Sequence, residues 1–328
     1  MIHDLVTGGA GFIGSHLVEA LLERGHRVTV IDNESTGSYE NLHRVSGHPH
    51  LLTVKGSVSE QMMLREVMAD CQTIYHLAAA VGVELIASAP IETIETNIYP
   101  TQLVLSEMYR RYQAGDTVKL FLASSSEVYG KNSKACWAEE DDLVFGPTTR
   151  ARWSYGVSKA IDEFLALAYT RQFQLPTVIG RFFNVVGPRQ IGDYGMVLPR
   201  FIEAALAGGP LVVHDDGKQT RCFAHVRDIV KSVIQLMELP TTTGQVFNIG
   251  SDQPVTIRHL AERVVAAVDP TLKIVTQSYA DAYSSDFEDV RFRVPDLTRL
   301  RQTLGEIPVS NLDAIIAELV ATRQNTNP

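Results

Sequence analysis

The sequence predicts an α/β fold in which a doubly wound parallel sheet is joined to a smaller, interleaved C-terminal domain. Up to about residue 180, short apolar runs alternate with segments whose apolar residues recur at helical spacing, as in successive βαβ units. A glycine-rich stretch, Gly8 to Gly14, lies between the first apolar run and the first helical segment. Beyond residue 180 the alternation becomes irregular, which fits a second domain interleaved with the last strands of the sheet.

The glycine-rich stretch predicts a turn that binds a pyrophosphate. It follows an expected strand at residues 2–6 and opens an expected helix with apolar residues from 17 to 22. Gly8 allows a tight turn, Gly11 lets the backbone approach a ligand, and Gly14 lets helix and strand pack closely. The N–H groups of Phe12 and Ile13, in the first helical turn, would point at phosphates, where the helix dipole favours negative charge.

The dinucleotide is predicted to be NAD. A second expected strand, residues 27–31, ends at Asp32, and a carboxylate there accepts hydrogen bonds from a ribose 2′-hydroxyl but repels a 2′-phosphate. Glycines alone would also fit an ordinary turn. Because strand, turn, helix, strand and acid follow in order, we expect a Rossmann-type NAD site, with Asn33 opening a polar loop, residues 33–41, along the adenosine.

Composition limits the remaining possibilities. The 328 residues are 45% hydrophobic and 20% charged with a net charge of −9, which argues against nucleic acid or anionic membranes as partners. The three cysteines are scattered and the histidines form no metal motif, so we expect reduced thiols, a cytoplasmic location and no metal. We find no apolar stretch near the ~20 residues that span a bilayer and no signal-peptide pattern.

The next segments extend the predicted sheet. Strands are expected at residues 51–54, 73–79, 118–122 and 177–180, and long helices at 90–112 and 154–173. Ser57 and Val58 follow the first of these strands, and Leu77, Ala78 and Ala79 end the second, where small residues let the backbone pass close to a cofactor. Later helices are expected at 198–206, 226–237, 256–268 and 308–322, and later strands at 210–213, 246–250 and 273–276.

Two groups of polar residues are candidates for catalysis. Ser125, Ser126 and Glu127 follow the strand at 118–122, and ligands of such sheets bind at the carboxyl ends of strands. Tyr155 and Lys159 are four residues apart and share one helix face. A Tyr–Lys pair at this spacing, taken alone, is most often surface decoration, so its meaning depends on the rest of the chain.

Taken together, these motifs resemble the extended short-chain dehydrogenase/reductase family, specifically its nucleotide-sugar epimerases, dehydratases and decarboxylases. The resemblance covers nearly the whole chain. It rests on Thr-Gly-Gly-Ala-Gly-Phe-Ile-Gly from Thr7, His76-Leu77-Ala78-Ala79, Ser125 with Val128-Tyr129-Gly130, Tyr155 with Lys159, Arg181 with Asn184, Gly187-Pro188-Arg189, and Phe247-Asn248-Ile249-Gly250.

This resemblance implies a mechanism. Tyr155 would remove the proton of a sugar 4-hydroxyl while C4 gives a hydride to NAD, and Ser125 would hydrogen-bond the oxygen that becomes the ketone. An unperturbed tyrosine titrates near ~10, so Lys159 and the positive nicotinamide would have to lower the pKa of Tyr155. Lys159 would also hold the nicotinamide ribose. The resemblance further places an acid that contacts adenine where this chain has Ser57.

By the same resemblance, Glu127 and Arg221 would determine which reaction follows formation of the 4-ketone. Ser-Ser-Glu-Val-Tyr-Gly with Gln-Thr-Arg221-Cys-Phe looks most like the UDP-glucuronate decarboxylases, as do Gly146-Pro147, Arg152-Trp153, and Phe287-Glu288-Asp289-Val290 with Arg293. A 4-keto sugar acid is a β-keto acid and loses carbon dioxide readily. Arg221 could grip the C6 carboxylate, or the diphosphate instead, and Glu127 could position the sugar, manage a proton at C5, or be a solvated loop acid.

The remaining substrate contacts and the alternatives stay open at this point. Arg189 and Arg293 are candidates for the diphosphate or for surface ion pairs, and Asn184 is expected to touch substrate. The product could be UDP-xylose or the free 4-keto pentose. A UDP-sugar 4-epimerase, acting on UDP-glucose or UDP-glucuronate, is the first rival; a 4,6-dehydratase and a catalytically silent NAD-binding protein follow.

Residues 1–185 with 222–256 are expected to bind NAD, and residues 186–221 with 257–328 the nucleotide sugar. By resemblance we expect a homodimer formed through helices at 101–112 and 154–173.

Overall fold

The predicted doubly wound sheet is present in the computed structural model, which describes residues 1–80, 90–192, 196–279 and 290–326. Phe287, Glu288 and Asp289 of the decarboxylase-like motif lie outside these ranges. The sheet contains β1 (His3–Thr7), β2 (Arg27–Asp32), β3 (Leu51–Lys55), β4 (Thr73–His76), β5 (Lys119–Ser125), β6 (Thr177–Phe182) and β11 (Gln245–Ile249). All are parallel, in the order β11-β6-β5-β4-β1-β2-β3.

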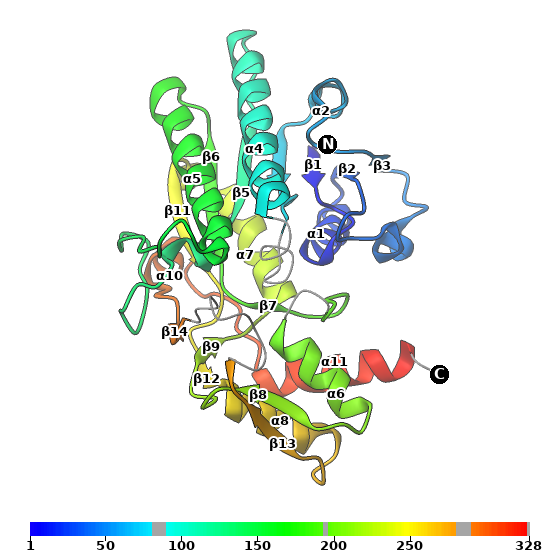
Figure 1. The fold of residues 1–328 in the computed structure, drawn as a ribbon. Helices are drawn as coiled ribbons and strands as arrows, with labels where there is room; N and C mark the ends of the chain where they lie inside the picture. The colour runs from blue at the N-terminus through cyan, green and yellow to red at the C-terminus, as the bar shows by residue number, and fades with distance from the viewer. Residues whose placement is uncertain (81–89, 193–195, 280–289, 327–328) are drawn as a thin grey trace.

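Helices cover both faces of this sheet (Figure 1). One face packs against α2 (Gln61–Met68), α4 (Pro90–Gln113) and α5 (Ser154–Phe173), and the other against α1 (Phe12–Glu23), α7 (Val226–Glu238) and α10 (Thr298–Leu304). Alternation along β5 shows why: Leu120 and Leu122 join the core beneath α4, while Phe121 between them joins the core beneath α7. Since both faces are buried, the middle of β5 is continuously apolar from Leu120 to Ala123 rather than alternating.

The rest of the chain gathers beyond the carboxyl ends of the strands, in the lower half of Figure 1. There α6 (Val197–Leu206), α8 (Ile257–Val268) and α11 (Leu312–Thr326) share an apolar core with the parallel pair of β8 (Leu211–His214) and β13 (Ile274–Gln277). Two small sheets lie between this group and the main sheet. One pairs β7 (Val185–Val186) with β10 (Ala224–His225), and the other has the order β12-β9-β14.

The second small sheet matters for the site because it was not predicted and carries two arginines. It contains β9 (Thr220–Cys222), β12 (Pro254–Thr256) and β14 (Phe292–Arg293). Strands of two or three residues show no detectable period in sequence. In its parallel register Arg293 of β14 lies opposite Arg221 of β9, so residues distant in sequence become neighbours.

Some element limits differ from the prediction. The last helix begins at Leu312 and not at residue 308, because the Asn311 side chain accepts a hydrogen bond from the Asp313 N–H at 2.8 Å and caps the helix there. The strand expected at 73–79 ends at His76. The polar loop at 33–41 runs into a 3₁₀ helix, Tyr39–Val45, and α10 was not predicted.

Among the described residues, no helix is both long enough and apolar enough to cross a membrane.

The close packing of the glycine turn gives a first test. A Cβ at Gly14 would lie 2.1 Å from the Gly8 carbonyl oxygen, which belongs to backbone that cannot yield easily. We expect Gly14→Ala to lower the free energy of unfolding by about 1–3 kcal/mol, as overpacking does, and to weaken NAD binding. Chemical denaturation and calorimetric titration with NAD measure both effects.

Gly47→Ala is the matched control, because Gly47 is exposed and a Cβ there meets nothing within 4 Å. Equal behaviour of the two variants would contradict the packing role assigned to Gly14.

Candidate active site

The glycine turn forms a cradle of backbone at the start of α1. Gly8 has φ +69°, and a Cβ there would lie 2.8 Å from the Ala78 nitrogen in the segment after β4. The Leu77 N–H donates to the Thr7 carbonyl at 3.2 Å, and the Ala78 N–H donates to Thr7 Oγ1 at 3.2 Å. The backbone of the glycine turn at the start of α1 is therefore in direct contact with the backbone of the residues after β4. The first N–H groups of α1, which have no acceptor within the helix, face this cradle.

Asp32 ends β2 beside the cradle, as predicted. Its side chain is buried, and it accepts hydrogen bonds from the Ala10 N–H at 3.0 Å and the Glu34 N–H at 2.8 Å. Burial raises the pKa of Asp32, and the two backbone hydrogen bonds oppose this. The cradle exists because its glycines have no Cβ to fill it, and the Asp32 carboxylate lies beside it. This arrangement fits the pyrophosphate and the ribose of NAD.

The other predicted cofactor residues surround the same edge of the sheet. Asn33 Oδ1 accepts from the Ser35 N–H, and Ser57 Oγ accepts from the Ser59 N–H at 3.1 Å. Val58 is buried in the core beneath α2, and Ala79 is half-buried after β4.

A cavity of about 400 Å³ leads from the cradle to the candidate catalytic residues. It brings together residues from the glycine turn, the carboxyl ends of β5 and β6, the start of α5, and the second small sheet. The predicted residues that line it are Phe12, Ile13, Ser125, Ser126, Glu127, Tyr155, Asn184, Arg221 and Arg293. The sequence thus identified the polar groups at the centre of the cavity, but not most of its wall, which includes Phe182, His214 and Tyr279.

Ser125 and Tyr155 meet in this cavity. Ser125 is the last residue of β5 and caps the following 3₁₀ turn by accepting from the Glu127 N–H, and its side chain is hydrogen-bonded to Tyr155. Burial first, and then the nearby Glu127 carboxylate, raise the pKa of Tyr155 above its usual range, and the hydrogen bond with Ser125 and the charge of Arg293 offset only part of this rise. The expected lowering of this pKa by Lys159 and NAD stays a prediction. Lys159 lies one turn further along α5 and is buried, with its Nζ 2.8 Å from Asp162 Oδ2.

Glu127 is the centre of a buried cluster of arginines. Its Oε2 lies 2.7 Å from Arg152 Nη1 and its Oε1 lies 2.7 Å from Arg293 Nη2, and Arg221 adds a third positive charge. Burial alone would raise the pKa of Glu127, but the three arginines lower it to about 2. Glu127 is therefore a carboxylate at neutral pH and not a solvated loop acid.

Arg152 was noted in the sequence but given no role. The sequence indications were the decarboxylase-like Arg152-Trp153 pair and its place three residues before Tyr155, within the turn that starts α5. Arg293, considered for the diphosphate, lies against Glu127.

Two predicted substrate residues are held by other parts of the protein. Arg189 is ion-paired with Glu19 of α1 and donates to Ser15 Oγ at 3.0 Å, and it is not among the residues lining the cavity. Asn184 lines the cavity, but its Nδ2 donates to the Cys222 carbonyl at 2.9 Å.

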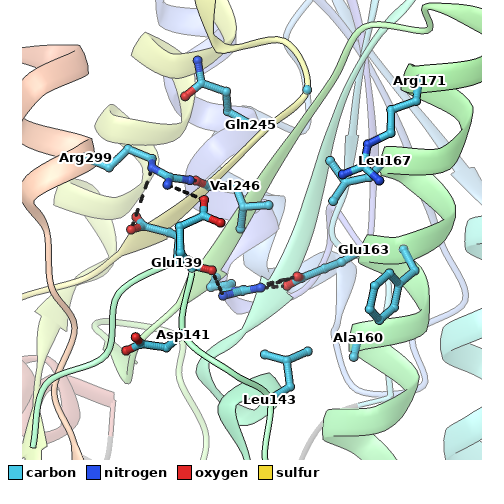
Figure 2. A pocket seen from close by; sticks show the side chains of 14 residues that line it. Glu139, Asp141, Leu143, Ala160, Glu163, Leu167, Arg171, Gln245, Val246 and Arg299 are labelled. Carbon is cyan, nitrogen blue, oxygen red and sulfur yellow. Dashed lines mark hydrogen bonds and ion pairs between the residues drawn. The ribbon is translucent and has the colours of Figure 1, made fainter. Parts of the chain in front are cut away.

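Buried charges behind the site connect its two halves. Arg181 of β6 donates to both carboxylate oxygens of Glu163 on α5 and to the Glu139 carbonyl at 3.1 Å, and its guanidinium lies 4.7 Å from the centre of the Tyr129 ring. Figure 2 shows Glu139 and Glu163 reaching this region from a loop and from α5. Glu163 also accepts from Ser124 Oγ, so α5 and the end of β5 are tied together.

Among the described residues, no group of three or more potential ligands could hold a metal ion.

His76 gives a pH-dependent prediction. It is buried at the end of β4, where its Nδ1 lies 2.8 Å from Thr7 Oγ1 and its Nε2 lies 3.3 Å from Thr101 Oγ1. Burial first, and then the Lys159 charge, lower the pKa of His76 to about 3. Below the unfolded pKa of about 6.5 only the unfolded chain takes up this proton, so stability falls as pH falls, by about 1.4 kcal/mol per pH unit from this residue.

We expect His76→Gln to flatten the decline in unfolding free energy between pH 6.5 and pH 5, measured by urea denaturation. The exposed His43→Gln should retain the parent slope. An unchanged slope in His76→Gln would contradict a neutral, buried His76.

Comparison with known proteins identifies the family of this chain. The sequence matches the model of the family described as GDP-mannose 4,6 dehydratase over residues 5–319. It is 39% identical over 299 residues to a UDP-N-acetyl-alpha-D-glucosaminuronate decarboxylase of Bacillus cytotoxicus, covering 91% of this chain and 90% of that protein. It is 35% identical over 315 residues to UDP-glucuronic acid decarboxylase 3 of Arabidopsis thaliana, covering 93% and 84%.

Solved structures include similar proteins. A UDP-N-acetylglucosamine 4-epimerase of Methanobrevibacter ruminantium, bound to UDP-N-acetylmuramic acid, has a TM-score of 0.88 at 27% identity and covers 99% of both chains. A UDP-glucuronic acid 4-epimerase of Bacillus cereus, bound to UDP-glucuronic acid and NAD, has a TM-score of 0.85 at 26% identity, covering 99% of this chain and 100% of that one.

Proposed function

Because this chain belongs to the GDP-mannose 4,6 dehydratase family of extended short-chain dehydrogenases/reductases, we propose that it is an NAD-dependent UDP-glucuronate decarboxylase. The observation that carries the choice of reaction is the cluster of Arg152, Arg221 and Arg293 around the carboxylate of Glu127. Guanidinium groups bind carboxylates bidentately, so a cluster of arginines at the cavity wall suits a sugar that carries a carboxylate.

The reaction begins at Tyr155. When bound in the cradle, NAD would supply the acceptor for the hydride that leaves C4 of the sugar. Tyr155 removes the proton of the 4-hydroxyl, and Ser125, which already contacts Tyr155, hydrogen-bonds the same oxygen. Lys159 lies beneath Tyr155 on α5, where its ammonium can bind the ribose hydroxyls.

Loss of carbon dioxide then needs no strong acid. The C6 carboxylate is β to the new ketone, so the C5–C6 electrons move toward the ketone oxygen as carbon dioxide departs. Ser125 and protonated Tyr155 stabilise the resulting enolate, and C5 then takes up a proton from water. Arg221 binds the carboxylate, and ionised Glu127 orients Arg152 and Arg293 rather than donating a proton.

The rivals make different demands on the same residues. A 4-epimerase needs Tyr155 and Ser125 but not Glu127, so full activity of a Glu127→Ala variant would favour it. A 4,6-dehydratase requires a second acidic group, and Ser126 stands beside Glu127 instead. A silent NAD-binding protein would be indifferent to Tyr155→Phe.

The direct test is to incubate the protein and NAD with UDP-glucuronate and to follow carbon dioxide release together with the proton NMR spectrum of the sugar. We expect carbon dioxide and a UDP-pentose, either UDP-xylose or the 4-keto sugar. A galacturonate signal without carbon dioxide would overturn the proposal in favour of epimerisation. UDP-N-acetylglucosaminuronate is the second substrate to test, because of the 39% identity to an enzyme named for it.

The arginine roles can be separated by substitution. We expect Arg221→Met to raise the KM for UDP-glucuronate and to lower kcat/KM by roughly 10²-fold, since a charged hydrogen bond contributes about 1.5–3 kcal/mol. Steady-state carbon dioxide release measures this. An unchanged KM would remove Arg221 from carboxylate binding.

We further propose a cytoplasmic homodimer, with residues 1–185 and 222–256 binding NAD and residues 186–221 and 257–328 binding the sugar. The dimer is supported by apolar side chains left exposed on the adjoining helices α4 and α5: Ile91, Ile94, Val157, Ile161 and Phe164. Phe164 is 68% exposed.

We expect Phe164→Glu to shift the protein toward monomers in analytical ultracentrifugation. Val275→Glu, which alters an exposed apolar residue far from α5 on β13, should leave the mass unchanged. A monomeric parent protein would exclude the homodimer.

A further inference from the structure

The strongest remaining feature is a buried ion pair on α5, in the turns that follow Tyr155. Lys159 is 2% exposed and Asp162 is fully buried, and both lie on the inner face of α5, with Nζ and Oδ2 separated by 2.8 Å. Burying an ammonium without a counter-charge is strongly unfavourable for folding, because the ion loses its hydration. The carboxylate of Asp162 supplies the counter-charge that offsets this loss of hydration.

The same carboxylate also acts on Tyr155. A negative charge on this face of α5 disfavours the phenolate, and Asp162 accordingly raises the pKa of Tyr155. Lys159 has three N–H donors, and the bond to Asp162 uses one of them, which fixes the direction of the other two. Asp162 thus controls both where Lys159 points and how much of its charge remains unbalanced.

We propose that Asp162 is a positioning residue, which holds the Lys159 ammonium on the inner face of α5 and limits how strongly this ammonium stabilises the Tyr155 phenolate. The proposal rests on the proposed function, in which Tyr155 is the base. It concerns a residue outside the cavity: Asp162 touches Lys159 and does not line the space that holds substrate.

Among the described residues, the other titratable groups near Tyr155 and Lys159 are either paired with another residue or neutral. Glu127 and Arg293 face Tyr155 from across the cavity and pair with each other. His76 of β4 faces Lys159 and is neutral. Glu163, next to Asp162 on α5, is bound by Arg181. Asp162 is therefore the carboxylate whose removal changes the balance at Lys159 most directly.

The test is the ionisation of Tyr155 in the NAD-bound protein, followed by NMR of tyrosine labelled with ¹³C at Cζ and assigned with Tyr155→Phe. We expect Asp162→Asn, which keeps a hydrogen-bond acceptor but removes the charge, to shift the Tyr155 titration to lower pH. Glu163→Gln, which removes the neighbouring charge from the Arg181 pair, should shift it less. The same Tyr155 titration in Asp162→Asn and the parent protein, or an upward shift, would overturn the proposal, even if the melting temperature fell.

A second comparison serves if Asp162→Asn does not fold. Lys159→Met leaves Asp162 buried without its partner, whereas Lys159→Met combined with Asp162→Leu removes both charges. We expect the double variant to melt at a higher temperature than the single one, and equal melting temperatures would overturn the pairing.

Neither measurement uses a sugar substrate. A failure of carbon dioxide release would therefore refute the proposed decarboxylase without touching Asp162, and an unshifted titration would refute the role of Asp162 without touching the decarboxylase.

Discussion

The carboxylate of Glu127 holds together the part of the site that distinguishes this protein from a simple NAD-binding sheet. Arg152 comes from the turn before α5, Arg221 from β9 and Arg293 from β14, and these three cations would repel one another in a buried cavity. Glu127 lies between Arg152 and Arg293 at hydrogen-bond distance from both. It thereby fixes two small strands and the start of α5 relative to the end of β5.

The parallel sheet explains why these groups can meet at all. Strands β1, β5 and β6 end at the same edge, so the glycine turn, Ser125 and Phe182 line one cavity. The buried Arg181–Glu163 pair then joins β6 to α5 and holds the helix that carries Tyr155 and Lys159. The positions of these groups therefore depend on charges that lie outside the cavity.

The sequence was sufficient to predict the regular βαβ part of the fold. Long periodic segments predicted α5 with its observed limits, and the ordered strand, glycine turn, helix and Asp32 predicted the cofactor cradle. It was insufficient where contacts join distant, very short segments. Nothing in the spacing of Arg221 and Arg293 indicated that they share a register in a sheet of strands two or three residues long.

The sequence also did not show which charged residues pair with one another. Arg189 was a candidate for substrate, but it lies against Glu19 and Ser15 of α1, a pairing that only the folded loop after β7 creates. Lys159 was expected to act on Tyr155, and its bond to Asp162 could not be separated in sequence from an ordinary i, i+3 surface pair. Burial decides such cases, and burial is a property of the whole fold.

In the proposed mechanism, oxidation at C4 precedes the loss of carbon dioxide. The most direct measurement is a single turnover of NAD-bound protein with UDP-glucuronate carrying hydrogen or deuterium at C4, following reduced-nicotinamide absorbance and carbon dioxide release together. We expect the absorbance to rise first, deuterium to slow this rise, and carbon dioxide to follow it. Carbon dioxide released without any absorbance change, and at a rate unaffected by deuterium, would contradict it.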